Sequence, residues 1–422
     1  MFLDHLPRRH FIAKLRRAVS LEGIGNNETY GLIFSAASDV VRLLEEYALR
    51  GAAWDIAFAL ALAEDDNPLG RAAELRPDPA GTVCGLASGE LWDILRTLAA
   101  VKKFIDTDDQ YASLRPLSDY TPANDRALPL HGDTRARVLE LAGALAQAAN
   151  AEEALRGLAH FYSACGSGPF ALNRAFRWSA GRLLPVRDLD PQRLDDLVGY
   201  ASQKAELLAN TEHFVRGRSA NNVLLYGDSG TGKSSSVRAL LNEERLVAAG
   251  LRMVELYKDQ FREIPELLQV LRGRNYRFVI FMDDLSFEEF EVEYKYLKAL
   301  IEGGIERKPE NVVICATSNR RNLVREVWND RKQSSDDVHG WDTMQEKLSL
   351  ADRFGVTIWY GAANKEQYME IVRALASECG IDVDHDALER LALRWEIGKG
   401  SFTGRTARQF VQHLLVEGME DD

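Results

Sequence analysis

Apolar side chains recur every three or four residues through the first part of the chain, which is the spacing of an amphipathic helix. Three such stretches cover residues 40–48, 91–101 and 134–164. Residues 106–133 are polar and include three prolines, so we expect a long loop there. The pattern predicts a mostly α-helical N-terminal domain over residues 1–190. Because no group of His, Asp, Glu or Cys at ligand spacing occurs in it, we expect this domain to recognise a partner.

Short apolar runs that alternate with helical segments replace this pattern after residue 190. Such runs are typical of strands that are buried on both faces of a parallel sheet. They cover residues 223–226, 253–257, 278–282, 312–316 and 356–360. We therefore predict an α/β domain over residues 191–361, a three-layer parallel sheet with its binding site at the carboxyl ends of the strands. Helical spacing at residues 368–377, 387–395 and 405–416 then predicts a small helical lid domain over residues 362–422.

One glycine-rich motif lies between the first of these runs and a helical segment. Residues 227–235 read Gly-Asp-Ser-Gly-Thr-Gly-Lys-Ser-Ser, which fits the nucleotide-phosphate-binding pattern G-x-x-x-x-G-K-[ST]. The strand–loop–helix context argues against a chance match. The backbone N–H groups of such a loop enclose phosphates, and the helix N-terminus adds partial positive charge. The residues expected to bind nucleotide are Gly227, Asp228, Ser229, Gly230, Thr231, Gly232, Lys233, Ser234 and Ser235, with Lys233 on the β- and γ-phosphates and the Ser234 hydroxyl on Mg²⁺.

Two carboxylates end the apolar run at residues 278–282. Asp283 and Asp284 follow Lys233 by about fifty residues, and acids at the end of a buried strand are what Mg²⁺-dependent phosphoryl transfer requires. We expect Asp283 to hold the metal, through water, and Asp284 to orient the attacking water. The alternative, a plain strand terminus, is disfavoured by the intact phosphate loop.

Two further residues follow the later strands. Asn319 comes at the end of the run at residues 312–316; we expect that strand to lie between the first and the third, so that the amide senses the γ-phosphate, although Asn is also common in ordinary turns. Arg353 precedes the last strand, after the polar and mobile stretch expected at residues 329–342. Its position at the edge of the domain suits an arginine finger that acts on a neighbouring subunit. A surface salt bridge is the alternative for Arg353.

The predicted lid offers Arg405 and Arg408, which are three residues apart and therefore near one face of the last helix. Either could contact the γ-phosphate and report its loss as movement of the lid. We prefer Arg408, because Phe410 and Leu414 can then pack on the opposite side.

These motifs, in this order, resemble those of the AAA+ ATPases, and their particular residues are similar to those of a bacterial AAA+ family of uncharacterised function. The matching segments are residues 221–234, 281–286, 316–320, 350–355 and 404–410, which correspond to Walker A, Walker B, sensor 1, the arginine-finger box and sensor 2. The resemblance covers residues 198–416. It implies ATP hydrolysis in subunit-shared sites of a ring or partial ring, coupled to the movement of a macromolecule. It also implies that Val198 and Gly199, with the adjoining Tyr200, touch the adenine.

The chain departs from the AAA+ pattern at two places. Most members have Glu where this chain has Asp284, which predicts slow turnover, although replication initiators and helicase loaders are similar in using Asp-Asp. The segment after the second run carries Tyr257 and Phe261 among charges, without a clear aromatic pore motif. An alternative is therefore an ATP-switched loader or adaptor that acts on DNA or on a DNA-handling enzyme. A small-molecule P-loop kinase would leave Arg353 and the lid arginines unused.

Composition limits the partners and the compartment. The chain of 422 residues is 46% hydrophobic and 27% charged, with a net charge of −12, which disfavours broad affinity for DNA or anionic membranes. Its four cysteines form no C-x-x-C pair, as expected of reduced thiols. No apolar stretch is long enough to cross a bilayer. We expect a cytoplasmic homo-oligomer that uses ATP and Mg²⁺.

Overall fold

The structure is a computed structural model that describes residues 10–21, 26–123, 130, 132–287, 293–302, 308–321, 323, 350–381 and 383–420. The chain divides into two compact units. Unit 1 comprises Met1–Arg174 and Pro185–Asp188, and unit 2 comprises Ala175–Leu184 and Leu189–Asp422. The expected polar stretch at residues 329–342 lies outside the described residues. No helix in the described ranges is long and apolar enough to cross a membrane.

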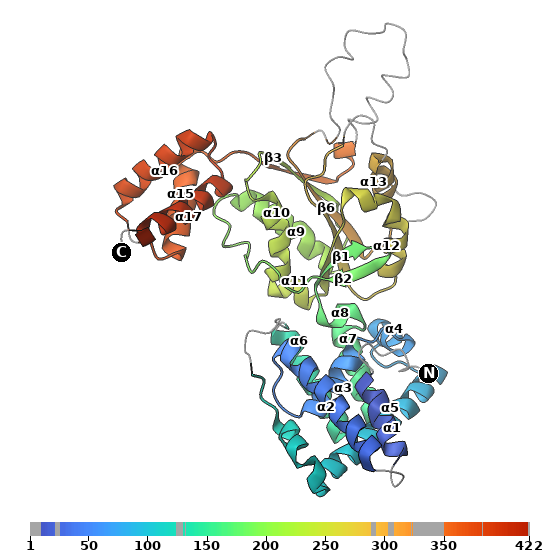
Figure 1. The fold of residues 1–422 in the computed structure, drawn as a ribbon. Coiled ribbons are helices and arrows are strands. Elements are labelled where there is room, and N and C mark those ends of the chain that lie inside the picture. The colour runs from blue at the N-terminus through green and yellow to red at the C-terminus, as the bar shows by residue number, and fades with distance from the viewer. Residues whose placement is uncertain are drawn as a thin grey trace. The chain divides into compact units, whose positions relative to one another are not determined.

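Unit 1 is helical, as the apolar spacing predicts (Figure 1). Its centre is α3, in which every residue except Asp55 is buried, because this helix is apolar on all sides. Asp55 forms an ion pair with Lys102, 2.5 Å away. The helices are α1 (His10–Ser20), α2 (Asn26–Tyr47), α3 (Ala53–Ala63), α4 (Pro68–Leu75), α5 (Thr82–Thr107), α6 (Gly132–Gln147), α7 (Ala151–Cys165) and α8 (Pro169–Leu172).

The long loop expected at residues 106–133 is only partly a loop. Residues Asp109–Asp119 form a 3₁₀ helix, η1, whose first turn is capped by the Asp108 side chain. Tyr111, Leu114 and Leu117 of η1 are buried in the core of unit 1. The side chains of this segment therefore pack at three-residue spacing, which suits a 3₁₀ helix and tolerates Pro116.

In the described residues, unit 2 is built on a seven-stranded sheet in the order β2-β1-β4-β5-β6-β3-β7. The five predicted strands are present and parallel: β3 (Val223–Gly227), β4 (Leu251–Glu255), β5 (Arg277–Met282), β6 (Val312–Ser318) and β7 (Val356–Tyr360). The predicted fold class is confirmed, and β6 lies between β3 and β5 as expected. Because the strands are parallel, the residues that follow β3, β5 and β6 meet at one edge of the sheet.

Helices cover both faces of this sheet, with α9 and α10 on one side and α12 and α13 on the other (Figure 1). The helices of this part are α9 (Ala201–Val215), α10 (Lys233–Ala239), η2 (Leu240–Asn242), α11 (Glu244–Ala248), η3 (Lys258–Glu263), α12 (Ile264–Leu271) and α13 (Glu293–Glu302). The last three helices, α15 (Lys365–Glu378), α16 (His385–Lys399) and α17 (Gly404–Glu420), have an apolar core of their own.

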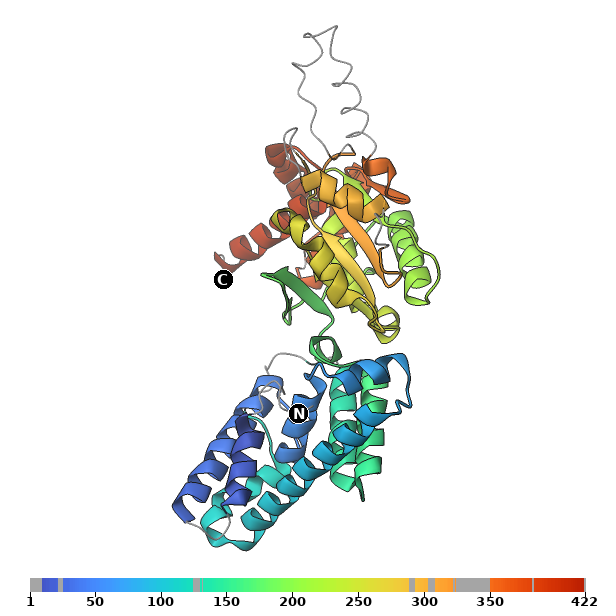
Figure 2. The same cartoon turned by 90° about the vertical axis from the view of Figure 1, so that its right-hand side faces the viewer.

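Two strands lie in a segment that the sequence analysis placed in the helical N-terminal domain. β1 (Ala175–Ser179) pairs in parallel with β4, and β2 (Arg182–Pro185) forms the edge of the sheet (Figure 2). Ala180 and Gly181, both with positive φ, make the two-residue turn of a hairpin between them. The expected boundary at residue 190 therefore differs from the structure. Phe176 and Trp178 are buried and alternate with the exposed Arg177, which is the period of a strand.

The space around two helical glycines, Gly70 in α4 and Gly89 in α5, predicts opposite effects of substitution by alanine. A Cβ atom at Gly70 would lie 2.4 Å from Cβ of Ser167, and Ser167 is held to the same helix by two hydrogen bonds to Glu74. Gly70→Ala should therefore lower the free energy of unfolding by about 1–3 kcal/mol. Gly89, inside α5, has open space around it, so Gly89→Ala should raise stability by about 0.5–1 kcal/mol. Urea denaturation of the full chain measures both; equal stability of Gly70→Ala and wild type would contradict this packing.

Candidate nucleotide-binding site

The glycine-rich loop is fixed against the edge strand β7. Gly227 has a φ of 133°, and a Cβ atom on it would lie 2.1 Å from the carbonyl oxygen of Tyr360. The N–H of Asp228 donates to that carbonyl at 3.0 Å, and a carboxylate oxygen of Asp228 accepts from the N–H of Ala362 at 2.7 Å. Only glycine permits this close approach of two backbones. Gly227 and Asp228 thus anchor the loop to β7.

The loop opens onto a cavity of about 660 Å³. Its walls include the predicted residues Ser229, Gly230, Thr231, Gly232, Lys233, Ser234 and Ser235, together with Asp283, Asp284, Asn319 and Arg408. Val198 and the neighbouring Tyr200 also line it, whereas Gly227, Asp228 and Gly199 are not among its described lining residues. The structure thus brings these residues from five separate stretches of the sequence to one cavity, at the edge of the sheet that the strand order defines.

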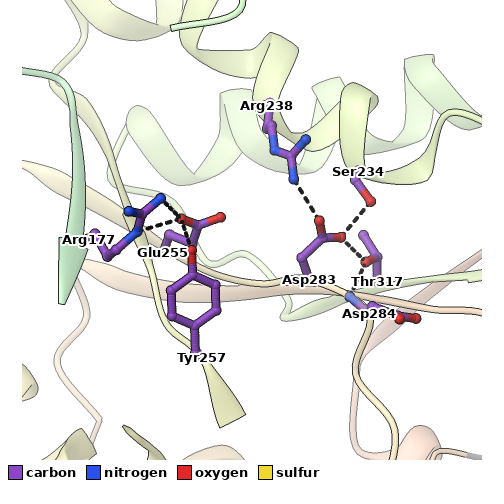
Figure 3. A network of polar contacts seen from close by, with 8 residues as sticks. All are labelled: Arg177, Ser234, Arg238, Glu255, Tyr257, Asp283, Asp284 and Thr317. Atoms are coloured by element: carbon purple, nitrogen blue, oxygen red, sulfur yellow. Dashed lines mark hydrogen bonds and ion pairs between the residues drawn. The ribbon is translucent and has the colours of Figure 1, made fainter. Parts of the chain in front are cut away.

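Asp283 joins three elements at the floor of this cavity (Figure 3). Its Oδ1 atom accepts hydrogen bonds from the hydroxyls of Ser234, on α10, and Thr317, on β6. Its Oδ2 atom accepts from Nη2 of Arg238 at 2.6 Å. The carboxylate expected to serve the metal therefore lies beside the hydroxyl expected to ligate it.

Asp284 and Asn319 are also paired. Nδ2 of Asn319 donates to Oδ1 of Asp284 at 2.8 Å, and Oδ1 of Asn319 accepts from Nζ of Lys233 at 3.1 Å. The backbone N–H of Asp284 donates to the Thr317 hydroxyl at 2.9 Å. Asp284 has a φ of 49°, a left-handed conformation that is uncommon for a residue other than glycine. This conformation turns the chain sharply after β5 and places both acids at the cavity.

The charge of Lys233 is only partly compensated by its surroundings. Its ammonium donates to the carbonyl oxygens of Gly227, at 2.9 Å, and Asp228, at 2.6 Å. Burial lowers the pKa of Lys233, while the carboxylates of Asp228, Asp284 and Asp283 act in the opposite direction and Arg405 lowers it further. A bound polyphosphate would oppose both lowering effects and would favour the charged lysine.

The two lid arginines occupy different positions relative to the loop. Both line the cavity, but the N–H of Arg405 lies 3.4 Å from the carbonyl oxygen of Gly230, and a Cβ atom on Gly230 would lie 3.1 Å from that of Arg405. Arg405, at the start of α17, therefore touches the loop through its backbone N–H and its Cβ atom. Arg408 as the sensor stays a prediction from the sequence; the charge of Arg405, which lowers the pKa of Lys233, supports Arg405 as the alternative.

Arg353 lies apart from these groups. It is half-buried in the turn before β7 and is not among the described residues that line the cavity. The role of Arg353 as an arginine finger for a neighbouring subunit stays a prediction.

Two polar residues of the site were not assigned roles from the sequence. Thr317 is completely buried in β6 and links the two acids, and Arg238 lies one helical turn after Ser234 on α10. The spacing of four between Ser234 and Arg238 would have shown that they share a face. Tyr200 stacks on Tyr360, with ring centres 4.9 Å apart, and its hydroxyl donates to the carbonyl of Gly361 at 2.7 Å. This contact fixes the segment expected to touch a nucleobase.

The donor set at Asp283 fits Mg²⁺. Mg²⁺ prefers oxygen ligands and is usually bound by one or two carboxylates together with substrate phosphates. Ser234 and Asp283 provide such oxygens beside the phosphate loop. No group of three or more His, Cys, Asp or Glu suited to a metal occurs among the described residues, so a metal here would rely on the nucleotide for further ligands.

The sequence matches a family model described as "Protein of unknown function (DUF815)" over residues 171–418, more than half of the chain. The chain belongs to this family. The matched region of the DUF815 family contains every residue proposed above for the nucleotide site. No match is found among curated proteins.

The chain is also similar in structure to several AAA+ proteins of known structure. One is RuvB of Thermotoga maritima, described as a Holliday junction branch migration motor: it is 21% identical over 53% of this chain and 63% of its own, with a TM-score of 0.37. Another is the AAA domain of FIGL-1 in complex with ADP, 18% identical over 56% of this chain and 76% of its own, with a TM-score of 0.38. The aligned part spans less than two thirds of the RuvB chain.

The effect of the Arg405 charge on Lys233 predicts how the two lid arginines differ. Arg405→Ala should weaken the binding of a non-hydrolysable ATP analogue by about tenfold or more, on the scale of one charge-assisted hydrogen bond. Arg408→Ala should have a smaller effect, because no effect of its charge on Lys233 is described. Titration of each variant with a fluorescent form of this analogue measures the affinity, and titration with ADP shows how much of it depends on the γ-phosphate. A larger loss of affinity for Arg408→Ala than for Arg405→Ala would reverse the assignment.

Proposed function

We propose that the protein is a Mg²⁺-dependent ATPase of the AAA+ type that remodels or switches a macromolecular partner. One observation carries the proposal: Lys233, Ser234, Asp283, Asp284 and Asn319 come from the ends of three parallel strands and are joined by hydrogen bonds in one cavity. Phosphoryl transfer depends on positioning and charge stabilisation, which is what such a set of residues supplies.

Each residue has a role that its chemistry supports. Lys233 and the loop backbone bind the β- and γ-phosphates, and Ser234 and Asp283 hold Mg²⁺, which neutralises charge on the phosphates. Asp284 accepts the hydrogen bond of a water molecule and turns it toward the γ-phosphate. Asn319 fixes Asp284 on one side and Lys233 on the other, so the base and the phosphate-binding cation keep a constant separation.

The aspartate at position 284 favours slow hydrolysis. Its side chain is one methylene shorter than glutamate, so a water molecule that it holds lies closer to the backbone of β5 and farther from the phosphate. A bound ATP then persists long enough to act as a signal to the lid, through Arg405 and α17. We therefore favour a switch over a fast motor.

The site is completed by a neighbouring subunit in this proposal. Arg353 does not line the cavity of its own chain, although an arginine that stabilises transition-state charge is worth about 10³–10⁵ in rate. A ring or partial ring of identical chains would bring the Arg353 side chain of one subunit to the nucleotide of the next.

The partner is a protein in preference to DNA. The net charge of −12 opposes the phosphate neutralisation that gives DNA-binding proteins most of their non-specific affinity. The helical unit 1 is the part of the chain that the site chemistry leaves unused, and we assign partner recognition to it. An ATP-switched loader bound to a DNA-handling enzyme is one partner class of this kind.

ATP hydrolysis is tested by Lys233→Ala. Loss of the phosphate-binding cation should reduce turnover at least about a hundredfold, the scale on which removal of a single transition-state donor acts. Lys103→Ala, which removes an exposed lysine of α5, is the matched control and should hydrolyse ATP at the wild-type rate. Phosphate release in the presence of Mg²⁺ measures both; indistinguishable rates for wild type and Lys233→Ala would rule out hydrolysis at this site.

Subunit sharing is tested by mixing two inactive variants, Arg353→Ala and Asp284→Asn. In an equal mixture about a quarter of the sites combine an intact Asp284 with an intact neighbouring Arg353, so about a quarter of the activity should return. The wild-type protein mixed with itself gives the reference rate, and light scattering confirms that mixed oligomers form. Stable mixed oligomers without recovered activity would exclude a shared site.

A further inference from the structure

Two side chains of α10 converge on the same carboxylate. Ser234 and Arg238 are four residues apart and therefore lie on one face of the helix, directly above Asp283. Ser234 is the second residue of this helix, immediately after Lys233. The helix that begins at the phosphate loop thus carries both a metal-ligating hydroxyl and a guanidinium to the acid at the end of β5.

Both oxygens of Asp283 are occupied by protein donors. Oδ1 accepts from Ser234 and Thr317, and Oδ2 accepts from Arg238 at 2.6 Å, with side chains 47% exposed for the arginine and 26% for the acid (Figure 3). The guanidinium also lies over the ring of the buried Phe281, 5.6 Å from its centre, which restricts its position. The contact with the Phe281 ring thus helps to hold the Arg238 guanidinium against the Asp283 carboxylate.

The Ser234 hydroxyl and the Arg238 guanidinium have different effects on metal binding at Asp283. The Ser234 hydroxyl can keep its hydrogen bond to Oδ1 of Asp283 while its oxygen ligates Mg²⁺, so this contact is compatible with the metal-bound site. Arg238 brings a full positive charge to the same carboxylate and occupies Oδ2, which a water ligand of Mg²⁺ would otherwise use. Like charges repel, and two unit charges about 4 Å apart interact by about 1 kcal/mol even in water.

We propose that Arg238 is a built-in competitor of Mg²⁺ at Asp283, which raises the Mg²⁺ concentration that the nucleotide site requires. Without metal, the guanidinium keeps Asp283 paired and oriented beside Ser234. When nucleotide and Mg²⁺ bind, Arg238 gives up Oδ2 or shares it, and the free energy of the lost ion pair is subtracted from metal binding. This inference rests on the proposed nucleotide site and adds a residue that tunes its demand for metal.

The test measures metal-dependent nucleotide binding without hydrolysis. The full-length chain is incubated with N-methylanthraniloyl-ADP, and Mg²⁺ is added while the fluorescence of the bound nucleotide is followed. Arg238→Gln removes the charge and should lower the half-saturating Mg²⁺ concentration about fivefold, which corresponds to about 1 kcal/mol. Arg238→Lys keeps the charge and should remain within about twofold of wild type.

A matched arginine controls for the change in net charge. Arg245, on α11, forms a comparable exposed ion pair with Glu212 at 2.8 Å and does not line the cavity in the described structure, so Arg245→Gln should leave the Mg²⁺ requirement unchanged. Thermal denaturation without ligand checks that all variants fold. An unchanged or higher Mg²⁺ requirement in Arg238→Gln overturns the inference, as does an equal shift in Arg245→Gln or binding of ADP by wild type that is independent of Mg²⁺.

Failure of the proposed function has a different signature. If wild-type protein binds no N-methylanthraniloyl-ADP at any Mg²⁺ concentration, the nucleotide site itself is wrong and the role of Arg238 falls with it. If wild type binds the nucleotide in a Mg²⁺-dependent manner but Arg238→Gln does not lower the half-saturating Mg²⁺ concentration, the nucleotide site is supported and the competing role of Arg238 is wrong.

Discussion

The carboxylate of Asp283 is the point on which the geometry of the site depends. It is placed by β5, accepts from Thr317 of β6 and from Ser234 of α10, and so holds three elements in register at the carboxyl edge of the sheet. The parallel order β5-β6-β3 makes this possible, because adjacent strands deliver their last residues to the same place. The middle strand, β6, lies between the strand that leads to the phosphate loop and the strand that ends in the two acids.

Charge is distributed unevenly in this cavity. The described lining carries an excess of one positive charge before any ligand binds, with five cations (Lys204, Lys233, Arg238, Arg405 and Arg408) against four anions (Asp196, Asp283, Asp284 and Glu378). Burial of Lys233 is the main cause of its lowered pKa, and the charge of Arg405 lowers that pKa further. A polyphosphate would remove the excess, whereas a divalent cation alone would add to it. The site would therefore suit a nucleotide and metal together, and in our proposal Arg238 opposes metal that arrives first.

The sequence predicts most of the sheet and much of the site, and its failures have physical causes. Continuous apolar runs identify the five buried strands, and the phosphate loop, Asp283, Asp284 and Asn319 are recognisable because their chemistry requires fixed spacings. The β1–β2 hairpin is missed because strands of four or five residues leave too few alternating positions to outweigh their helical surroundings. Arg238 is missed because its function depends on a tertiary contact. The choice between Arg405 and Arg408 depends on how α17 approaches the loop, which helical periodicity does not specify.

The β1–β2 hairpin also restricts the movement of the segment that follows β4. In the segment after β4, the side chain of Gln260 donates to the carbonyl oxygen of Trp178 and the Trp178 indole donates to Glu263, so η3 is tied at two points to β1. Trp178 is fully buried, and a segment held in this way is poorly suited to grip and release a threaded polypeptide. The lid differs, because Arg405 at the start of α17 touches the phosphate loop directly. Under the proposed function, nucleotide state would therefore act first on the lid, which is the behaviour of a switch.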